Sequence, residues 1–230
     1  RGRDAGGPYV SSVENKIPKF EKHRMTERET LTSLNVSRET ESRLLAFADL
    51  IQKWTQKINL ISKGSAQDVW DRHILDSVQI YDLAPKGFSL WLDIGSGGGL
   101  PGVVVAALAA QFAPNARIAM IESDQRKAAF LRTALRELGL EGEVLAKRID
   151  GVGPMAADVL SARALAPLDH LLKFAERHLR PGGTAIFPKG KAAEQEIADA
   201  RTNWLFNIEK HASMTDADAR ILAIKDINRV

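Results

Sequence analysis

The sequence predicts an α/β protein: a parallel sheet with helices on both faces, closed by an antiparallel hairpin and preceded by a small helical part. Three observations support this prediction. From Ser89 onward, short apolar runs alternate with segments of helical periodicity, the pattern of successive β-α-β units. The end of the chain has two strand-like runs with no helix between them, which predicts the hairpin. Before Ser89, apolar side chains recur at helical spacing.

The N-terminal part is predicted to contain two helices, over residues 37–62 and 65–83. In the first, apolar side chains recur every three or four residues, and Ser37 is placed to cap the N-terminus. The second stops before Pro85, because proline does not continue a helix. Because this part is small, we expect it to pack on the sheet that follows.

Five apolar runs are predicted to be parallel strands: Ser89–Ile94, Arg117–Glu122, Val144–Ile149, Asp158–Ala162 and Thr184–Phe187. The helices predicted between and after them are Leu100–Gln111, Gln125–Leu138, Leu168–Leu179 and Ala192–Thr202. The closing hairpin is predicted to pair Phe206–Ala212 with Ile221–Ile227. The chain thus divides into residues 1–24, a helical part over 25–86 and a sheet domain over 87–230.

Charge is distributed unevenly along the chain. Residues 1–24 carry six basic and three acidic side chains, so the whole formal charge of +3 lies in this segment, which we interpret as an expression leader or disordered arm. Overall basicity is therefore no argument for RNA binding. Residues 163–191 carry a local excess, with six basic and two acidic side chains. This excess indicates either a solvated helix face or an anionic partner.

Composition excludes several classes of protein. The 230 residues are 44% hydrophobic and 27% charged, which excludes a disordered chain. The absence of cysteine excludes disulfides, thiolate metal sites and thiol nucleophiles. The longest apolar run, Val103–Ala110, is far too short to cross a membrane. The histidines show no metal-ligand spacing. We expect a cytoplasmic monomer without a metal or a membrane anchor.

A glycine-rich loop, DIGSGGGLPG, follows the first strand and begins at Asp93. Its glycines match two patterns, the G-x-G-x-x-G of dinucleotide enzymes and the acidic-x-G-x-G-x-G of methyltransferases that use S-adenosylmethionine (SAM). The second pattern uses Asp93, Gly95, Gly97 and Gly99. It fits better, because a carboxylate would attract the ammonium group of SAM and repel a pyrophosphate. We expect Asp93 and these three glycines to bind SAM.

Polar groups also end the next two predicted strands. Glu122 lies where a cofactor ribose needs a bidentate acceptor, although a surface carboxylate is the alternative. Ile149 and Asp150 lie where an adenine would be bound, and Asp150 is equally suited to cap a turn. A terminal hairpin is typical of class I SAM-dependent methyltransferases, whose sheet is Rossmann-like. We therefore expect this fold and SAM as the cofactor.

The methyl acceptor is constrained by what the chain lacks. Methylation of pyrimidine C5 needs a cysteine, and there is none. Amine methyltransferases of nucleic acids have Asn/Asp/Ser-Pro-Pro-aromatic after the fourth strand, and the stretch here, LSARALAPL from Leu160, does not fit. Guanine N7 has a free lone pair and needs no base. An active site without an obvious base or nucleophile is compatible with such an acceptor.

Several stretches together resemble the bacterial 16S ribosomal RNA guanine-N7 methyltransferases, the RsmG or glucose-inhibited division protein B family. These stretches are WTQKINLIS from Trp54, RHILDS from Arg72, the glycine loop with its LPG continuation, SARALAP from Ser161 and PKGK from Pro188. The resemblance spans roughly residue 44 to the C-terminus. It implies methylation of one guanine in 16S rRNA on the assembled small ribosomal subunit, with SAM as donor.

The resemblance also implies roles for particular residues. Gly95 and Leu100 would contact SAM, and Arg163 would lie beside both cofactor and substrate as a catalytic residue. Lys189, together with Lys191, would hold a phosphate or the guanine O6, and we assign Lys189 a catalytic role. We expect His73 and Asp76 to share a helix face that either fixes the second helix against the glycine loop or orients the RNA base.

One departure from the family is visible, because Gly98 stands where the family usually has proline, which predicts a more flexible loop before SAM binds. Two alternatives remain. One is a SAM-dependent methyltransferase acting on another RNA, a small molecule or a protein. The other is a ribosome-binding module that keeps the fold without turnover.

Overall fold

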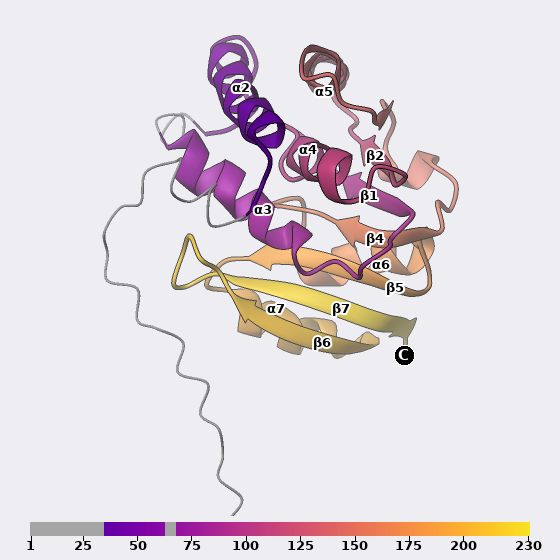
Figure 1. Cartoon of the computed structure of the whole chain (residues 1–230). Helices are drawn as coiled ribbons and strands as arrows, with labels where there is room; N and C mark the ends of the chain where they lie inside the picture. The colour runs from indigo at the N-terminus through magenta and orange to yellow at the C-terminus, as the bar shows by residue number, and fades with distance from the viewer. Residues whose placement is uncertain (1–34, 63–67) are drawn as a thin grey trace, which may run out of the picture.

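The computed structural model describes residues 35–62 and 68–230, and a seven-stranded sheet lies at its centre (Figure 1). The strand order is β3-β2-β1-β4-β5-β7-β6. The strands are β1 (Leu90–Ile94), β2 (Arg117–Ile121), β3 (Glu143–Leu145), β4 (Ala157–Ser161), β5 (Leu179–Lys189), β6 (Trp204–Ala212) and β7 (Arg220–Arg229). The predicted leader over residues 1–24 lies outside the described residues.

Strand pairing confirms the predicted fold. Strand β1 lies parallel to both β2 and β4, and β5 is parallel to β4. Strand β7 is antiparallel to β5 and to β6, so the hairpin closes one side of the sheet. Because the chain order reverses between β1 and β4, the carboxyl ends of these two strands border the crevice in which open α/β sheets bind ligands.

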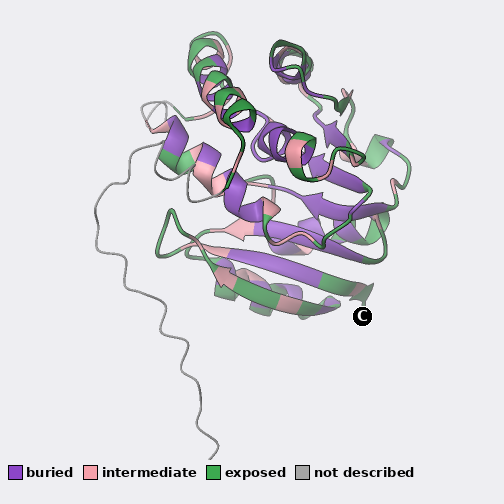
Figure 2. Cartoon of the chain, in the orientation of Figure 1, coloured by how far each residue is buried: buried purple, intermediate pink, exposed green. Residues whose placement is uncertain are grey.

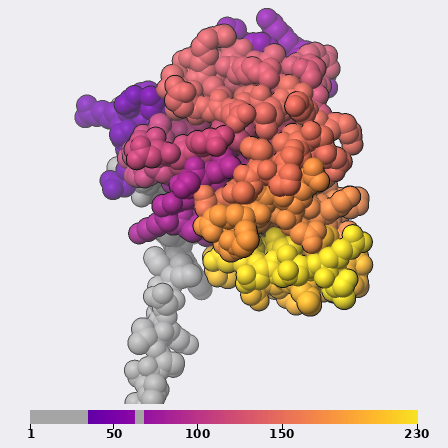
Figure 3. All heavy atoms as spheres, turned by 90° about the vertical axis from the view of Figure 1, so that its right-hand side faces the viewer, coloured from indigo at the N-terminus to yellow at the C-terminus, as the bar shows by residue number. Residues whose placement is uncertain are grey.

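Helices cover both faces of the sheet. One face carries α2 (Arg38–Thr55), α3 (Leu75–Tyr81), α4 (Gly102–Phe112) and α5 (Gln125–Glu137), and the other carries α6 (Leu168–His178) and α7 (Ala193–Ala200). The buried side chains form one cluster on each face, and Figure 2 shows this burial along the central strands and the inner sides of the helices. In the space-filling view the C-terminal strands form one end of the molecule (Figure 3).

Side-chain alternation along β1 determines where its polar end points. Trp91 packs into the cluster of α2 to α5, whereas Leu90 and Leu92 pack against the opposite helices. Since side chains two residues apart share a face of a strand, Asp93 points to the same side as Trp91. The aspartate is therefore directed beneath the start of α4 and is fully buried.

Aromatic contacts attach the N-terminal helices to the sheet domain. Phe47 of α2 stacks on Phe130 of α5 with ring centroids 6.4 Å apart. Tyr81 of α3 lies parallel to Trp91 of β1 at 5.8 Å. The two helices thus share a hydrophobic core with the sheet. None of the helices among the described residues has the length and apolar character that a membrane crossing requires.

The N-terminal helices differ from their predicted bounds. Helix α2 ends at Thr55 rather than at residue 62, because the carbonyl of Trp54 accepts from the N–H groups of Lys57 and Ile58 and closes the helix in a turn. The predicted start of the second helix at residue 65 lies outside the described residues. Its described part opens with a π-helical turn, η2 (Trp70–Ile74), that continues into α3.

Among the strands, β3 and β5 differ most from their predicted bounds. Strand β3 stops at Leu145, because the N–H of Lys147 donates to the Leu145 carbonyl in a tight turn that takes the chain off the sheet. Ile149 and Asp150, predicted to end this strand, lie instead in the 3₁₀ turn η3 (Ile149–Gly151). Strand β5 starts at Leu179 rather than at the predicted Thr184, and its register with β4 shifts between Ala157 and Val159.

Candidate functional site

The glycine loop adopts a backbone that only glycine forms readily. Gly95, Gly97 and Gly99 have φ of 64°, 54° and 79°, in the left-handed region that side chains disfavour. A Cβ at Gly97 would meet nothing closer than a backbone oxygen at 3.7 Å, so the loop is not tightly packed at this residue. The loop then enters α4 at Gly102, where a Cβ would lie 2.8 Å from the Asp93 carboxylate.

Asp93 supports this loop from beneath. Its Oδ1 accepts from the hydroxyl of Ser161 at 2.7 Å, and its Oδ2 accepts from the N–H of Gly102 at 3.2 Å. Burial raises the pKa of Asp93 to about 6, and the hydrogen bonds from Ser161, Ser96 and Gly102 oppose that rise. Both oxygens have protein donors, so the carboxylate holds β1, β4 and α4 together.

Ser161 was not predicted as a site residue from the sequence. It is fully buried, lies beside Asp93 in the β1–β4 register and accepts from the indole N–H of Trp91 at 2.9 Å. The available signal was a polar residue at the end of each of two apolar strands. Such a pair is expected to meet only when the strands are neighbours, and the strand order is not readable from the motif alone.

Glu122 closes the far side of the loop. It follows β2, is buried, and its two oxygens accept from the N–H of Gly97 at 2.8 Å and of Asp124 at 2.7 Å. The carboxylate thus connects the end of β2 to the glycine loop. Leu100 lies buried behind that loop, while Ile149 is half-buried and Asp150 exposed in η3.

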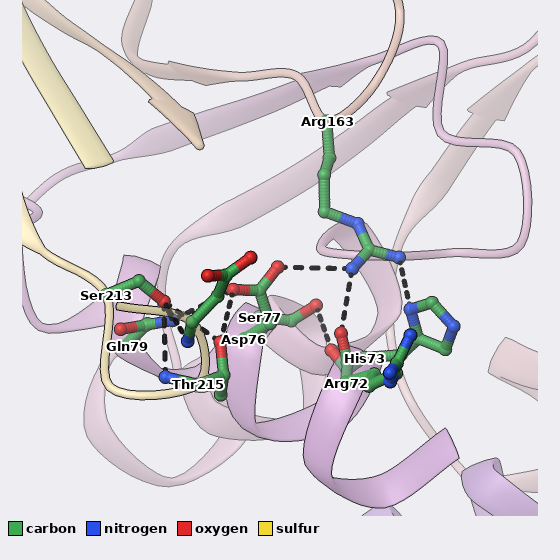
Figure 4. Close-up of polar contacts among 9 residues, drawn as sticks. Arg72, His73, Asp76, Ser77, Gln79, Arg163, Ser213 and Thr215 are labelled. Atoms are coloured by element: carbon green, nitrogen blue, oxygen red, sulfur yellow. Dashed lines mark hydrogen bonds and ion pairs between the residues drawn. The ribbon is translucent and has the colours of Figure 1, made fainter. Parts of the chain in front are cut away.

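Arg163, in the loop after β4, reaches across to the N-terminal helices (Figure 4). Its Nη1 donates to Oδ2 of Asp76 at 3.1 Å and to the Arg72 carbonyl at 3.3 Å. Its Nη2 lies 2.9 Å from Nδ1 of His73. The side chains of Arg163 and Asp76 are each 17% exposed. His73 and Asp76 do share a helix face, as predicted, but the partner they contact is Arg163 rather than the glycine loop.

Leu165, two residues further along, lies against Gly95. A Cβ built on Gly95 would be 2.5 Å from Cδ1 of Leu165. The leucine is 36% exposed and follows Ala164, which has a positive φ of 51°. The loop after β4 therefore covers part of the glycine loop, a contact that nothing in the sequence pattern indicated.

Lys189 lies at the end of β5, away from solvent. Its Nζ donates to the carbonyl of Ala166 at 2.8 Å and to Oε2 of Glu196 at 2.7 Å, and its side chain is only 9% exposed. The same Glu196 oxygen accepts from the N–H of Leu168 at 2.8 Å. These contacts favour an anchoring role for Lys189 at the loop after β4 over the substrate-binding role suggested by the sequence. Lys191, by contrast, is exposed.

We expect the substitution Lys189→Met to lower the free energy of unfolding by about 2 kcal/mol, because it leaves the Glu196 carboxylate and the Ala166 carbonyl without their shared donor. Urea unfolding measures this loss. Lys191→Met is the matched control and should change the stability by less than about 0.5 kcal/mol. Equal stabilities for the two variants would contradict the anchoring role.

The described residues bring Asp93, Glu122 and the three glycines together at the carboxyl ends of β1 and β2, with Arg163 and Leu165 beside them after β4. No three His, Asp or Glu side chains within residues 35–62 and 68–230 are grouped as metal ligands would be. The arrangement is a glycine loop, flanked by carboxylates and one guanidinium, at the switch point where open α/β sheets have their ligand crevice.

This sheet, with its terminal hairpin and glycine loop after β1, is the fold of class I SAM-dependent methyltransferases. The O-methyltransferase TomG from Streptomyces achromogenes, solved in complex with SAM, matches with a TM-score of 0.53 and 18% identity over 85% of this chain and 94% of that one. A predicted O-methyltransferase from Agrobacterium tumefaciens matches with a TM-score of 0.52 and 19% identity, over 67% and 81% of the two chains.

Sequence comparison identifies the family within this class. The family model GidB, rRNA small subunit methyltransferase G, matches residues 40–224. Ribosomal RNA small subunit methyltransferase G of Ruegeria sp. (strain TM1040) is 54% identical over 197 residues, 86% of this chain and 96% of the relative. The protein of the same name from Cereibacter sphaeroides is 48% identical over 206 residues, 90% of this chain and all of the relative. The chain belongs to the rRNA small subunit methyltransferase G family.

Proposed function

We propose that this protein transfers the methyl group of SAM to N7 of a guanine in 16S rRNA of the small ribosomal subunit, and that it acts in the cytoplasm as a monomer. The observation that carries the proposal is the glycine loop between Asp93 and Glu122, in a chain that belongs to the rRNA small subunit methyltransferase G family. The relatives named ribosomal RNA small subunit methyltransferase G match this chain over 96% and 100% of their own length.

The residues around the glycine loop suit SAM. The loop is not tightly packed at Gly97, and Glu122 stands at the end of β2, where ribose hydroxyls would find a carboxylate. Ile149 and Asp150 in η3 would border the adenine. Asp93 would act from beneath by fixing the loop, because it is fully buried and accepts hydrogen bonds from Ser161 and Gly102. SAM, when bound, supplies an electrophilic methyl group on a sulfonium.

The acceptor needs alignment rather than activation. Guanine N7 carries a lone pair in the plane of the base, so no proton has to be removed before the methyl group is transferred. The protein therefore contributes mainly by orienting the base and excluding water. An arginine reads guanine well through O6, and Arg163 presents a guanidinium at the crevice. We assign it the guanine contact, while Lys189 positions the loop that carries it.

The proposal is tested by offering tritiated SAM to three substrates: naked 16S rRNA, assembled small subunits and total protein. We expect label in the RNA of the small subunits, at a guanine where reduction and aniline treatment cleave the chain, since N7-methylguanosine is sensitive to that treatment. Label confined to protein or small molecules would overturn the proposal. Binding to small subunits without any label would instead support a silent ribosome-binding module.

A further inference from the structure

Within residues 35–62 and 68–230, the polar contacts given for Arg163 all go to one turn of helix from another part of the chain. Its three polar contacts go to the Arg72 carbonyl, the His73 ring and the Asp76 carboxylate (Figure 4). Those acceptors lie about ninety residues earlier in the sequence and approach the guanidinium from the side of α3. Acceptors on both Nη atoms fix the position of the guanidinium and the plane in which it lies.

His73 meets Arg163 as an acceptor. A guanidinium only donates, so Nδ1 of the ring accepts from Nη2 and the ring proton resides on Nε2. Nε2 is buried and has no partner within the described residues. Burial, and then the charge of Arg163, lower the pKa of His73 to about 4, while Asp76 raises it and Arg72 lowers it further. The ring is therefore neutral at physiological pH, and its one basic nitrogen, Nδ1, already accepts the hydrogen bond from Arg163.

Asp76 is in turn fixed by the C-terminal hairpin. Its Oδ1 accepts from Nε2 of Gln79 at 2.9 Å and from the hydroxyl of Thr215 at 3.1 Å, which leaves Oδ2 for Arg163. Gln79 also accepts from the N–H of Met214 at 2.9 Å and donates to Ser213 at 3.2 Å. The turn between β6 and β7 therefore braces α3 at the residue that holds Arg163.

The charges of this cluster suit the transfer of a methyl group from a cation. A free guanidinium beside the reaction would repel both the sulfonium and the positive charge that develops on a methylated N7. The Asp76 carboxylate offsets the charge of Arg163, and the neutral His73 adds none. The cluster can thus present hydrogen-bond donors to a base at little electrostatic cost.

We propose that His73 and Asp76 are positioning residues, which orient Arg163 toward the guanine and balance its charge, with the turn 213–215 as their brace. This inference rests on the proposed function for the identity of the base. The contact between His73 and Arg163 does not depend on the proposed function, because it can be tested without substrate.

The first experiment measures methyl transfer to small subunits with wild type, His73→Ala, His73→Gln and Asp76→Asn. We expect His73→Ala to lower kcat by about 10–100-fold with an unchanged SAM dissociation constant, since a misplaced group near the reaction costs about that much. His73→Gln keeps an acceptor and should restore most of the rate. Asp76→Asn should lower kcat about tenfold without raising KM for the subunits, since the unbalanced cation still attracts RNA.

Controls separate positioning from folding. Asp71→Asn makes the same change of charge on an exposed residue of the same turn, and it should leave kcat unaltered. In a double-mutant cycle, His73→Ala combined with Arg163→Ala should be no slower than Arg163→Ala alone, because both act through one group. Multiplying effects, or a glutamine variant as slow as the alanine variant, would overturn the inference.

The second experiment needs no activity. An NMR titration of the His73 ring should show its pKa rising in Arg163→Ala, because that substitution removes a neighbouring positive charge. An unchanged pKa would show that the two side chains do not meet. If wild type fails to methylate small subunits while the pKa does shift, the proposed function falls and the His73–Arg163 contact stands.

Discussion

Arg163→Ala is expected to lower kcat/KM for small subunits by about 10–100-fold, while SAM still binds with its normal affinity. The reason is that the Arg163 guanidinium lies beside the glycine loop and is held in place by His73 and Asp76, and losing a paired contact to guanine costs about 1–3 kcal/mol. Isothermal calorimetry with SAM and single-turnover methyl transfer measure the two quantities separately. The loss should appear in the methyl-transfer step.

Two further variants sharpen this prediction. Arg163→Lys keeps the charge but cannot reach His73 and Asp76 together, so it should recover little of the rate. Arg136→Ala removes an exposed arginine from the last turn of α5 and should leave the rate unchanged. An Arg163→Ala variant that methylates small subunits normally would remove Arg163 from the site. A loss matched by Arg136→Ala would indicate general RNA attraction instead.

Gly95→Val is expected to abolish SAM binding. The residue has a φ of 64°, which costs a branched side chain at least about 1–2 kcal/mol, and its Cβ would lie 2.5 Å from Leu165. The added side chain would occupy the surface of the loop where we propose that SAM binds. Calorimetry should show no measurable heat of SAM binding, and methyl transfer should fall to background.

Because Gly95→Val also strains the backbone, its controls address folding. Gly139→Val places the same side chain at a residue with a φ of 61°, where a Cβ meets nothing within 4 Å, and it should bind SAM as wild type does. Gly95→Ala combined with Leu165→Ala relieves the contact with the leucine while keeping a Cβ on the loop. SAM binding as tight as in wild type in that double variant would mean that Leu165, and not the cofactor, fills the space beside Gly95.

Much of the fold could be predicted because its signals are local. The apolar runs, the helical periodicity and the missing helix before the last strand are each contained in about a dozen residues, and β1 pairs with the next strand, β2, as sequential strands most often do. The pairing of β1 with β4 is not indicated by any such local segment. The glycine loop, by contrast, is local. Its positive φ values at Gly95, Gly97 and Gly99 follow directly from where the glycines stand.

The site was harder to predict, because its contacts join distant segments. The spacing of His73 and Asp76 indicated a shared helix face, but nothing in that spacing indicates that Arg163 is the group it meets. The burial of Lys189 was hard to predict for the same reason. A lysine in a loop after a strand is usually exposed, and only the position of Glu196 on α7 explains why this one is buried.

The place of β7 in the sheet has a consequence for the order in which the protein matures. This strand follows all others along the chain, yet it lies between β5 and β6 and so is an interior strand rather than an edge. During synthesis, β5 and β6 can be joined in one sheet only after β7 has been made, because β7 pairs with both strands. The turn that braces Asp76 is fixed only when β7 completes the hairpin. The site that we propose for methyl transfer is therefore completed only after β7 has been synthesised and paired with β5 and β6.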